Sequence, residues 1–243
     1  MRKYIDIINY ENDIAKALKT AIEFMTGAGR VGRINRIVII APNRQVCQNI
    51  EIILQSFPCR KNGTAFNMIG DRLNIVLESK TSYNHFDSDG VIFFGLGSQE
   101  IFELEERRSF AVELAIKEYT DISLWCGTWG VENISTGQSI LLTPNATIQH
   151  ACDQITNACN TTHEYGFHPS DEEFVKRVIR TLHALEPSPV NSDEFFAYAK
   201  REGKWTLALA MQASAWINKL HNGGTFKGGV LKKTEMKDLY GRW

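Results

Sequence analysis

The chain has 243 residues, of which 43% are hydrophobic and 23% charged, and its formal net charge at pH 7 is −1. These values are ordinary for a globular protein, and the balanced charge argues against bulk electrostatic binding to DNA or to an anionic membrane. The sequence has no signal-peptide pattern, no apolar run long enough to cross a bilayer and no Cys-x-x-Cys pair among its five cysteines. We therefore expect a cytoplasmic protein without a disulfide framework.

Predicted strands and helices alternate along the first 165 residues. Residues 36–41 (RIVIIA) and 90–95 (GVIFFG) are continuous apolar runs, which is typical of strands buried on both faces of a parallel sheet. Further strands are predicted at 4–10, 121–127 and 138–143, and helices at about 11–25, 43–57, 65–79, 99–119 and 147–159. This alternation predicts an α/β fold, with a Rossmann-like or flavodoxin-like parallel sheet sandwiched by helices.

After about residue 165 the sequence predicts helices alone. Ser170 and Glu173 have capping-box spacing in the helix predicted at 168–185, and Ser192 can cap the next helix. Residues 204–224 are apolar nearly all round and end in two glycines, which is typical of a buried helix. The predicted parts are an α/β domain (1–165), a C-terminal helical section packed on it (166–224) and a tail (225–243).

Three predicted strand-to-helix turns carry residues that are suited to a ligand. They contain Pro42-Asn43, the run Gly95-Leu96-Gly97-Ser98, and Thr143-Pro144-Asn145. Glycine permits close approach of the backbone to a ligand, and a helix N-terminus attracts an anion. Open α/β sheets bind ligands at the carboxyl ends of their strands, so we predict the main pocket there. Its predicted lining comprises some of Pro42, Asn43, Gly95, Gly97, Ser98 and Thr143.

Two other motifs are explained without a cofactor or a metal. GAGRVG (27–32) has the letters of a dinucleotide-binding fingerprint, but a helix precedes it and a strand follows it. That order is the reverse of what the fingerprint requires, so we interpret the motif as a helix stop. Cys152, Cys159, His163 and His168 lack the spacing of a zinc finger. We therefore expect no cofactor and no bound metal.

Glu113 is an acidic residue in an otherwise mostly apolar segment, RRSFAVELAIKE. On the helix predicted at 99–119 it shares one face with Glu106, Ser109 and Lys117. Lys117 stands four residues after Glu113, in the order that favours an ion pair on a helix. The simplest interpretation of Glu113 is therefore a solvent-exposed charge.

The order of short motifs in residues 36–127 gives a second interpretation. IVIIAPN ends a strand in Ala-Pro, Asp89 precedes the strand VIFF, and Glu113 precedes ISLWCG. This order resembles the nucleoside 2-deoxyribosyltransferase-like group and its TIR-like relatives. The resemblance implies that Glu113 is a nucleophile or charge stabiliser at the anomeric carbon of a ribose. A carboxylate suits this role because the transition state of N-glycosidic cleavage is oxocarbenium-like.

An enzyme that acts at an N-glycosidic bond would also need residues that hold its ligand. Asp89 or the turn Gly95–Ser98 would hold it, and Trp125 or Trp129 would stack on a base. With Asn43 from the neighbouring turn, the candidate site consists of Glu113 as catalytic residue and Asn43, Asp89, Gly95, Gly97, Ser98 and Trp125 as ligand-binding residues.

Three functions remain open on the sequence alone. The first is hydrolysis or transfer at an N-glycosidic bond of a nucleoside or nucleotide. The second is non-catalytic binding of a nucleotide-like ligand at the same edge of the sheet. The third is an assembly role, with homo-oligomers formed through the C-terminal helices. Nucleic-acid binding by the tail is a weaker fourth, because acidic residues dilute its lysines.

Two structural features separate these functions. A buried Glu113 with a raised pKa in a cleft would favour the first, and an exposed pair with Lys117 would remove it. An exposed apolar face on residues 204–221 would favour the third.

Overall fold

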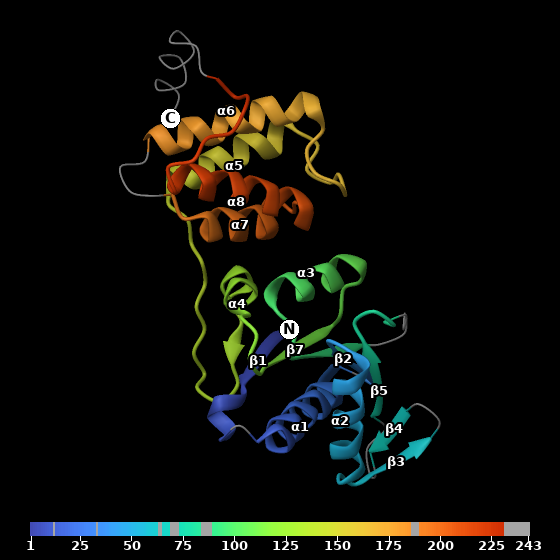
Figure 1. Cartoon of the computed structure of the whole chain (residues 1–243). Helices are drawn as coiled ribbons and strands as arrows, with labels where there is room; N and C mark the ends of the chain where they lie inside the picture. The colour runs from blue at the N-terminus through green and yellow to red at the C-terminus, as the bar shows by residue number, and fades with distance from the viewer. Residues whose placement is uncertain are drawn as a thin grey trace. The chain divides into compact units, whose positions relative to one another are not determined.

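The computed structural model describes residues 1–11, 13–32, 34–62, 65–68, 73–83, 89–185 and 190–230. The chain forms two compact units (Figure 1). The N-terminal unit comprises Met1–Cys126 and Val131–Ile140, and the C-terminal unit comprises Gly127–Gly130 and Leu141–Trp243.

The N-terminal unit is built on a mixed, mostly parallel sheet. Within the described residues this sheet has eight strands, in the order β3-β4-β5-β2-β6-β7-β1-β8. The strands are β1 (Arg2–Asp6), β2 (Arg36–Ala41), β3 (Cys59–Asn62), β4 (Ala65–Met68), β5 (Asn74–Ser79), β6 (Gly90–Phe94), β7 (Val112–Lys117) and β8 (Glu132–Asn133). β3 and β4 form an antiparallel extension next to β5, whereas the other neighbouring pairs are parallel. The predicted α/β class is therefore confirmed.

Helices cover both faces of this sheet (Figure 1). α1 (Ile14–Gly32) and α2 (Arg44–Gln55) lie on one face, and α3 (Ser98–Arg107) and α4 (Ser123–Trp129) follow β6 and β7 on the other. Apolar positions recur along α1 and α2 at helical spacing, so each helix can bury one face against the strands.

Alternate residues of each strand supply the two cores. Ile37 and Ile39 of β2 point into the core beneath α1 and α2. On the opposite face, the Phe93 ring lies edge-on to the rings of Phe110 and Trp125, with centroids 6.3 Å apart in both pairs. The strands are thus buried on both faces, as their continuous apolar runs predict.

The helix predicted at 99–119 is wrong beyond residue 107. α3 ends at Arg107, and β7 follows, parallel to β6 on one side and to β1 on the other. Because strands flank it on both edges and its side chains are buried up to Ile116, pairing outweighs the helical periodicity of this segment. Glu113 therefore lies in a strand.

Two further predicted elements are of the wrong type. Residues 65–79 contain β4 and β5 instead of a helix, because β5 pairs with β2 along its whole length. Residues 121–127 begin the helix α4 instead of forming a strand. Asp121 Oδ1 accepts the Ser123 N–H at 2.8 Å, which satisfies a donor at the start of that helix.

Three boundaries also differ from prediction. The strand predicted at 4–10 ends at Asp6, where the 3-10 helix Ile7–Tyr10 begins. α1 runs through Gly27 and Gly29 and ends at Gly32, the last residue of the motif interpreted as a helix stop, so it is longer than the helix predicted at 11–25. Residues 138–143, all of them described, form an isolated bridge at Ser139 in place of the predicted strand.

The C-terminal unit is helical, as predicted. Its helices are α5 (Ala146–Ala158), α6 (Pro169–Leu185), α7 (Ser192–Arg201) and α8 (Leu207–His221), and no described residue after Asn133 belongs to a named strand. α5 and α8 each pack against both α6 and α7, which closes a four-helix arrangement around one core. Buried Trp205 fills part of this core, and its indole N–H donates to Thr156 Oγ1 at 2.8 Å.

The division between the units differs from the predicted boundary at residue 165. The chain enters the C-terminal unit at Leu141, so α5 belongs to that unit. Gly127–Gly130 also group with it, and Arg201 donates to the carbonyl oxygens of Thr128 (2.9 Å) and Leu142 (3.3 Å) there. Of the predicted tail, 231–243 lie outside the described residues.

Both Pro-Asn turns place an asparagine at a helix N-cap. Asn43 Oδ1 accepts the Val46 N–H at 3.1 Å, and Asn145 Oδ1 accepts the Ile148 N–H at 2.9 Å. Each side chain therefore satisfies one of the first helical N–H groups, which have no partner within the helix.

We expect Asn145→Ala to lower the free energy of unfolding by about 1 kcal/mol, because α5 loses this cap. Asn145→Ser should retain most of the stability, since its hydroxyl can replace the amide oxygen. Urea unfolding followed by circular dichroism measures both variants. Wild-type stability of the alanine variant would contradict the capping role.

Candidate functional site

A pocket of about 650 Å³ opens at the carboxyl edge of the sheet, beside the ends of β2 and β5. This volume lies in the usual range of small-molecule sites, ~300–1,000 Å³. Pro42 and Asn43, two of the residues predicted to line a pocket at this edge, are in its wall. The rest of the lining comes from α2 (Arg44, Cys47, Gln48, Glu51), the β3–β4 hairpin (Lys61, Phe66) and the end of β5 with the turn after it (Leu77, Glu78, Ser79, Thr81, Ser82).

The pocket adjoins the topological switch point of the sheet. β2 and β6 are neighbours, but the chain leaves β2 through α2 on one face and leaves β6 through α3 on the other (Figure 1). Gly95, directly after β6, has a φ of +61°, and a Cβ placed on it would lie 3.8 Å from Cγ of Pro42. The turns after β2 and β6 therefore meet at the edge where open α/β sheets bind ligands.

Gly97 and Ser98 lie at this edge but are engaged within the protein. The Glu100 carboxylate accepts the Gly97 N–H at 2.9 Å, at the start of α3. Buried Ser98 donates its N–H (3.0 Å) and its hydroxyl (3.2 Å) to the Asp121 carbonyl oxygen, and its Oγ accepts the Trp125 N–H at 3.2 Å. Ser98 thus joins α3 to α4, and neither residue lines the pocket.

Charged side chains of both signs line the pocket. Lys61 of β3 forms an ion pair with Glu51 of α2, and its Nζ lies 5.8 Å from the centroid of the Phe66 ring. Arg44, the first residue of α2, is exposed. Two cations from different elements therefore border one cavity, which suits a ligand that carries an anionic group.

Hydroxyl groups gather where β5 ends. Ser79 Oγ lies 2.7 Å from Ser82 Oγ and 3.1 Å from Thr81 Oγ1. Cys47, on the α2 side of the pocket, has a thiol whose pKa is raised by burial. It is therefore protonated at neutral pH and acts as a neutral polar group, since the nucleophile would be the thiolate.

Asp89 and Trp125 do not lie at this pocket. Asp89 precedes β6, so it is at the amino edge of the sheet, where its Oδ2 accepts the N–H groups of Asn35 (2.9 Å) and Arg36 (3.3 Å). Trp125 is fully buried, and its indole N–H donates to Glu105 at 2.9 Å. Asp89 ties the start of β6 to the start of β2, and Trp125 fills the core beneath α4.

Glu113 is also at the amino edge, as the second residue of β7, opposite Arg2 of β1. Its residue exposure is 2%, so the interpretation as a solvent-exposed charge is wrong. Lys117, its expected partner, pairs with Asp6 at 2.9 Å instead. Residues four apart on a strand are far from each other along its length, whereas on a helix they are neighbours.

Arg2 lies between two buried carboxyl groups. Its Nε–H is directed at Glu105 Oε1, at 3.1 Å, while the same Nε lies 2.6 Å from Glu113 Oε2, within ion-pair distance but without hydrogen-bond geometry. Burial and the neighbouring Glu105 raise the pKa of Glu113 to about 8, and Arg2 offsets them in part.

The raised pKa decides which chemistry Glu113 can perform. With a pKa of about 8, the group is mostly protonated at pH 7. A protonated carboxyl group is neither a nucleophile nor a stabiliser of positive charge, the two roles that the resemblance implies. In that state Glu113 could serve only as a general acid or as a hydrogen-bond donor to its neighbours.

The remaining candidates lie in the C-terminal unit. Thr143 precedes α5 and belongs to that unit, so it is not at the end of a strand of the sheet. Cys152 is buried in α5, the His163 ring contacts Tyr165, and His168 Nδ1 lies 2.7 Å from Ser170 Oγ. Among the described residues, no group of three or more His, Cys, Asp or Glu side chains is placed to hold a metal ion.

The β5 side of the pocket was not predicted from the sequence. A helix was predicted at 65–79, whereas the strand β5 lies there and brings Ser79, Thr81 and Ser82 to the carboxyl edge. The usable signal was the apolar, β-branched run Ile75–Leu77 followed directly by a polar turn, which is typical of a buried strand.

A family model matches the C-terminal unit. Residues 144–243 match a family described as a domain of unknown function (DUF1889). The match begins close to Leu141, where the chain enters that unit, so the family boundary and the contacts agree. No curated protein and no solved structure matches the chain. None of the described helices combines the length and the apolar character needed to cross a membrane.

We expect the buried Glu113 to make stability depend on pH. Its pKa is about 8 in the folded protein and about 4.5 ordinarily, so between these values the folded protein holds a proton that the unfolded chain has lost. Stability should therefore fall as pH rises from about 5 to 8, by up to ~1.4 kcal/mol per pH unit, and level off above.

Glu113→Gln keeps the shape and the neutral state of the group, so it should remove this slope. Urea unfolding between pH 5 and pH 9 measures the difference between variant and wild type. Glu23→Gln, at an exposed position of α1, is the control and should keep the wild-type slope. An unchanged slope in Glu113→Gln would contradict the raised pKa.

Proposed function

We propose that the N-terminal unit is a non-catalytic binding module for a small nucleotide-like ligand. The observation that carries the proposal is the pocket of about 650 Å³ at the carboxyl edge, beside the switch point between β2 and β6. The resemblance of residues 36–127 to the nucleoside 2-deoxyribosyltransferase-like group supports the nucleotide class.

The groups in the pocket match the parts of a nucleotide. Arg44 and Lys61 would bind the phosphate, because both cations border the same cavity. The hydroxyl cluster of Ser79, Thr81 and Ser82, with the Glu78 carboxylate, offers hydrogen bonds to a ribose. Phe66, Leu77 and Pro42 provide apolar surface for a base.

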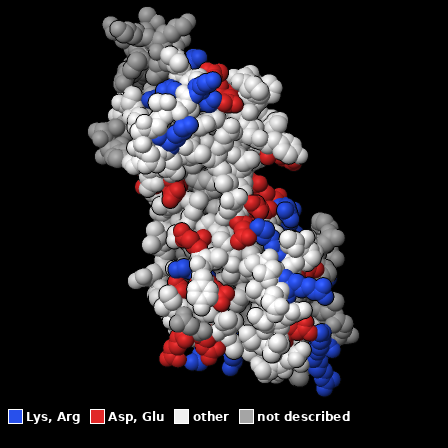
Figure 2. Space-filling view, in the orientation of Figure 1, with Lys and Arg blue, Asp and Glu red and all other residues white. Residues whose placement is uncertain are grey.

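Nucleic acid fits the surface less well than a small ligand. The net charge is −1, and on the face seen in Figure 2 basic and acidic side chains are interspersed. A polyanion requires a continuous basic surface, whereas a mononucleotide requires only a local pair of cations.

Calorimetric titration with a panel of nucleosides and their mono-, di- and triphosphates tests the proposal. We expect saturable one-to-one binding of at least one base class, with each nucleotide tighter than its nucleoside because the phosphate reaches the two cations. Failure of every member of the panel to bind would refute the proposed function.

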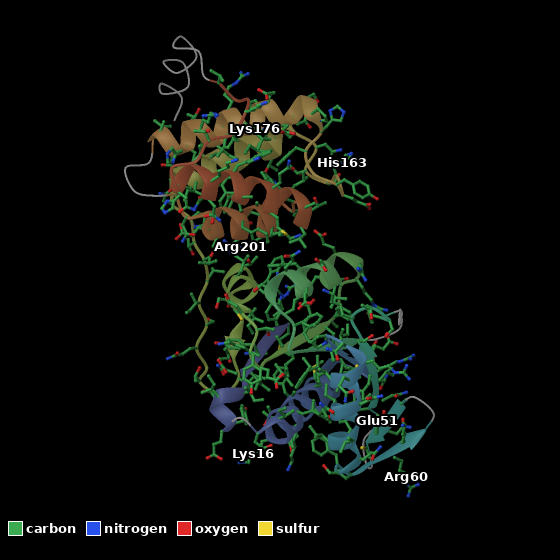
Figure 3. All side chains as sticks on the ribbon, viewed as in Figure 1. Lys16, Glu51, Arg60, His163, Lys176 and Arg201 are labelled. Atoms are coloured by element: carbon green, nitrogen blue, oxygen red, sulfur yellow. The ribbon has the colours of Figure 1, made fainter. Side chains whose placement is uncertain are left out.

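Three substitutions on neighbouring elements locate the phosphate. Lys61→Ala should weaken nucleotide binding about tenfold, or ~1.4 kcal/mol, and leave nucleoside binding unchanged. Arg60→Ala is the matched control, because Arg60 is the preceding residue of β3 and points away from the unit (Figure 3). Glu51→Gln should tighten nucleotide binding, since it frees Lys61 from its ion pair. Equal losses of nucleotide affinity in Lys61→Ala and Arg60→Ala would exclude a phosphate bound beside Lys61.

Cleavage or transfer at an N-glycosidic bond is the second candidate, because a Glu113 carboxyl group with a pKa of about 8 could protonate a leaving base as a general acid. Its reacting group would be at the amino edge, away from the pocket, and mostly neutral at pH 7. Incubation with nucleosides, nucleotides and NAD, followed by chromatography, tests it. Release of free base that Glu113→Gln reduces by orders of magnitude would replace the binding module with this activity.

Assembly through α8 has less support. The apolar residues Leu209, Ala213 and Ile217 are buried, and Met211 is the one large apolar side chain of α8 that is exposed, at 39%. The apolar character of α8 is thus explained by the core of its own unit.

A further inference from the structure

The chain folds back over α6 after α8 ends. Gly223 and Gly224 follow α8, and Gly223 has a φ of +74°, which favours glycine. The next residues, Thr225–Val230, are here called the return segment. Phe226 is half-buried and Gly229 is buried, whereas Thr225 and Lys227 are exposed.

The main chain of the return segment is held by two charged side chains of α6. Arg180 donates from Nη2 to the Phe226 carbonyl oxygen (2.6 Å) and from Nε to that of Gly228 (3.1 Å). Glu173 Oε2 accepts the Gly229 N–H at 2.8 Å. Two main-chain carbonyl oxygens and one main-chain N–H of the segment thus form charge-assisted hydrogen bonds with α6. Separate peptides are bound by contacts of the same kind.

The Phe226 ring is held among cations and a second aromatic ring. Cζ of Arg180 lies 4.5 Å and Nζ of Lys176 6.0 Å from the centroid of this ring, and the Trp216 ring lies 6.0 Å away. Lys176, on α6 (Figure 3), is buried, pairs with Glu172, and lies 5.1 Å from the Trp216 centroid. Cation–π contacts of this kind favour an aromatic residue at position 226.

The two glycines of the segment are required by geometry. Gly228 and Gly229 have φ of +87° and +62°, a region that other residues rarely adopt. A Cβ on Gly228 would collide with the Glu173 carboxylate, and one on Gly229 would lie 2.6 Å from the backbone carbon of Lys176. The site therefore specifies the pattern aromatic-Xaa-Gly-Gly.

The return segment can leave this site without unfolding the helices. Its described contacts are three hydrogen bonds to charged groups and one half-buried ring. Ordering the segment costs conformational entropy, which opposes these contacts. The core of α5–α8 consists of other residues, so release is a local opening that costs far less than global unfolding.

We propose that Glu173, Lys176 and Arg180 of α6, with Trp216 of α8, form a recognition site for an aromatic-Xaa-Gly-Gly segment. In this proposal the site also binds the return segment of a second copy of this chain. A second copy carries the same sequence, and the Gly223-Gly224 hinge lets the segment swing away from its own site. The chain's own segment fills the site at low concentration, because tethering gives it an effective concentration on the order of millimolar. Exchange between copies is favoured as concentration rises.

A synthetic peptide, Thr-Phe-Lys-Gly-Gly-Val, tests the recognition site in the full chain carrying Phe226→Ala. We expect a saturable shift of the Trp216 indole resonance in NMR titrations, and none when both peptide glycines are replaced by alanine. Adding Arg180→Ala, or Arg180→Gln if the alanine variant does not fold, should abolish the shift. No saturable shift, or equal binding of the two peptides, would overturn the site.

Mixing two variants tests the second copy as occupant. A chain with Arg180→Ala keeps an intact segment but loses the site, and a chain with Phe226→Ala keeps the site but loses the segment. We expect each to be monomeric alone and the mixture to form a one-to-one heterodimer in sedimentation experiments at high concentration. A mixture that sediments as the sum of its separate components would overturn exchange between copies.

Discussion

The double pairing of β2 organises the N-terminal unit. This strand is hydrogen-bonded to β5 on one side and to β6 on the other, and from Ile37 to Ala41 it is fully buried. After β2 the chain turns onto one face of the sheet, and after β6 it turns onto the other. The two following helices therefore diverge from the strand ends, which makes this edge the topological switch point of the sheet. The pocket at this edge lies on the β5 side of β2, between α2, the β3–β4 hairpin and the end of β5.

Strands with strong local signals could be predicted from the sequence, and those that depend on neighbours could not. The apolar runs at 36–41 and 90–95 have one reasonable interpretation, because an element apolar on every side must be buried on both faces. VELAIK has helical spacing and good helix formers, yet it is a strand because β1 and β6 both pair with it. β5 was not predicted for the same reason, because it is a strand through its pairing with β2. The hydroxyl groups that follow it were therefore not predicted to line the pocket. Asn43 and Pro42 were accessible to prediction because their turn chemistry is local.

The two edges of the sheet hold polar groups for different reasons. At the amino edge, Asp89 and Glu113 are engaged within the protein: exposed Asp89 accepts the N–H groups of Asn35 and Arg36 at the start of β2, and buried Glu113 shares Arg2 with Glu105. Enclosure raises the pKa of Glu113 and removes the charge that a glycosidic mechanism would use. At the carboxyl edge, Arg44, Lys61 and the hydroxyl groups after β5 border a cavity. A sequence motif gives the order of carboxylates and strands, but it does not give the edge on which each carboxylate lies.

In the C-terminal unit, too, the sequence alone does not predict how a segment is placed, as the residues after α8 show. A sequence with glycines and lysines after a helix is typical of a loosely ordered tail. In this chain Gly228 and Gly229 have the positive φ values that let the backbone lie against α6, and Arg180 and Glu173 bind its polar groups. A residue with a side chain would collide at both positions. Because these two glycines lack a Cβ, the backbone can contact α6 at both positions. They therefore make the binding of the segment specific, although composition alone would indicate a flexible tail.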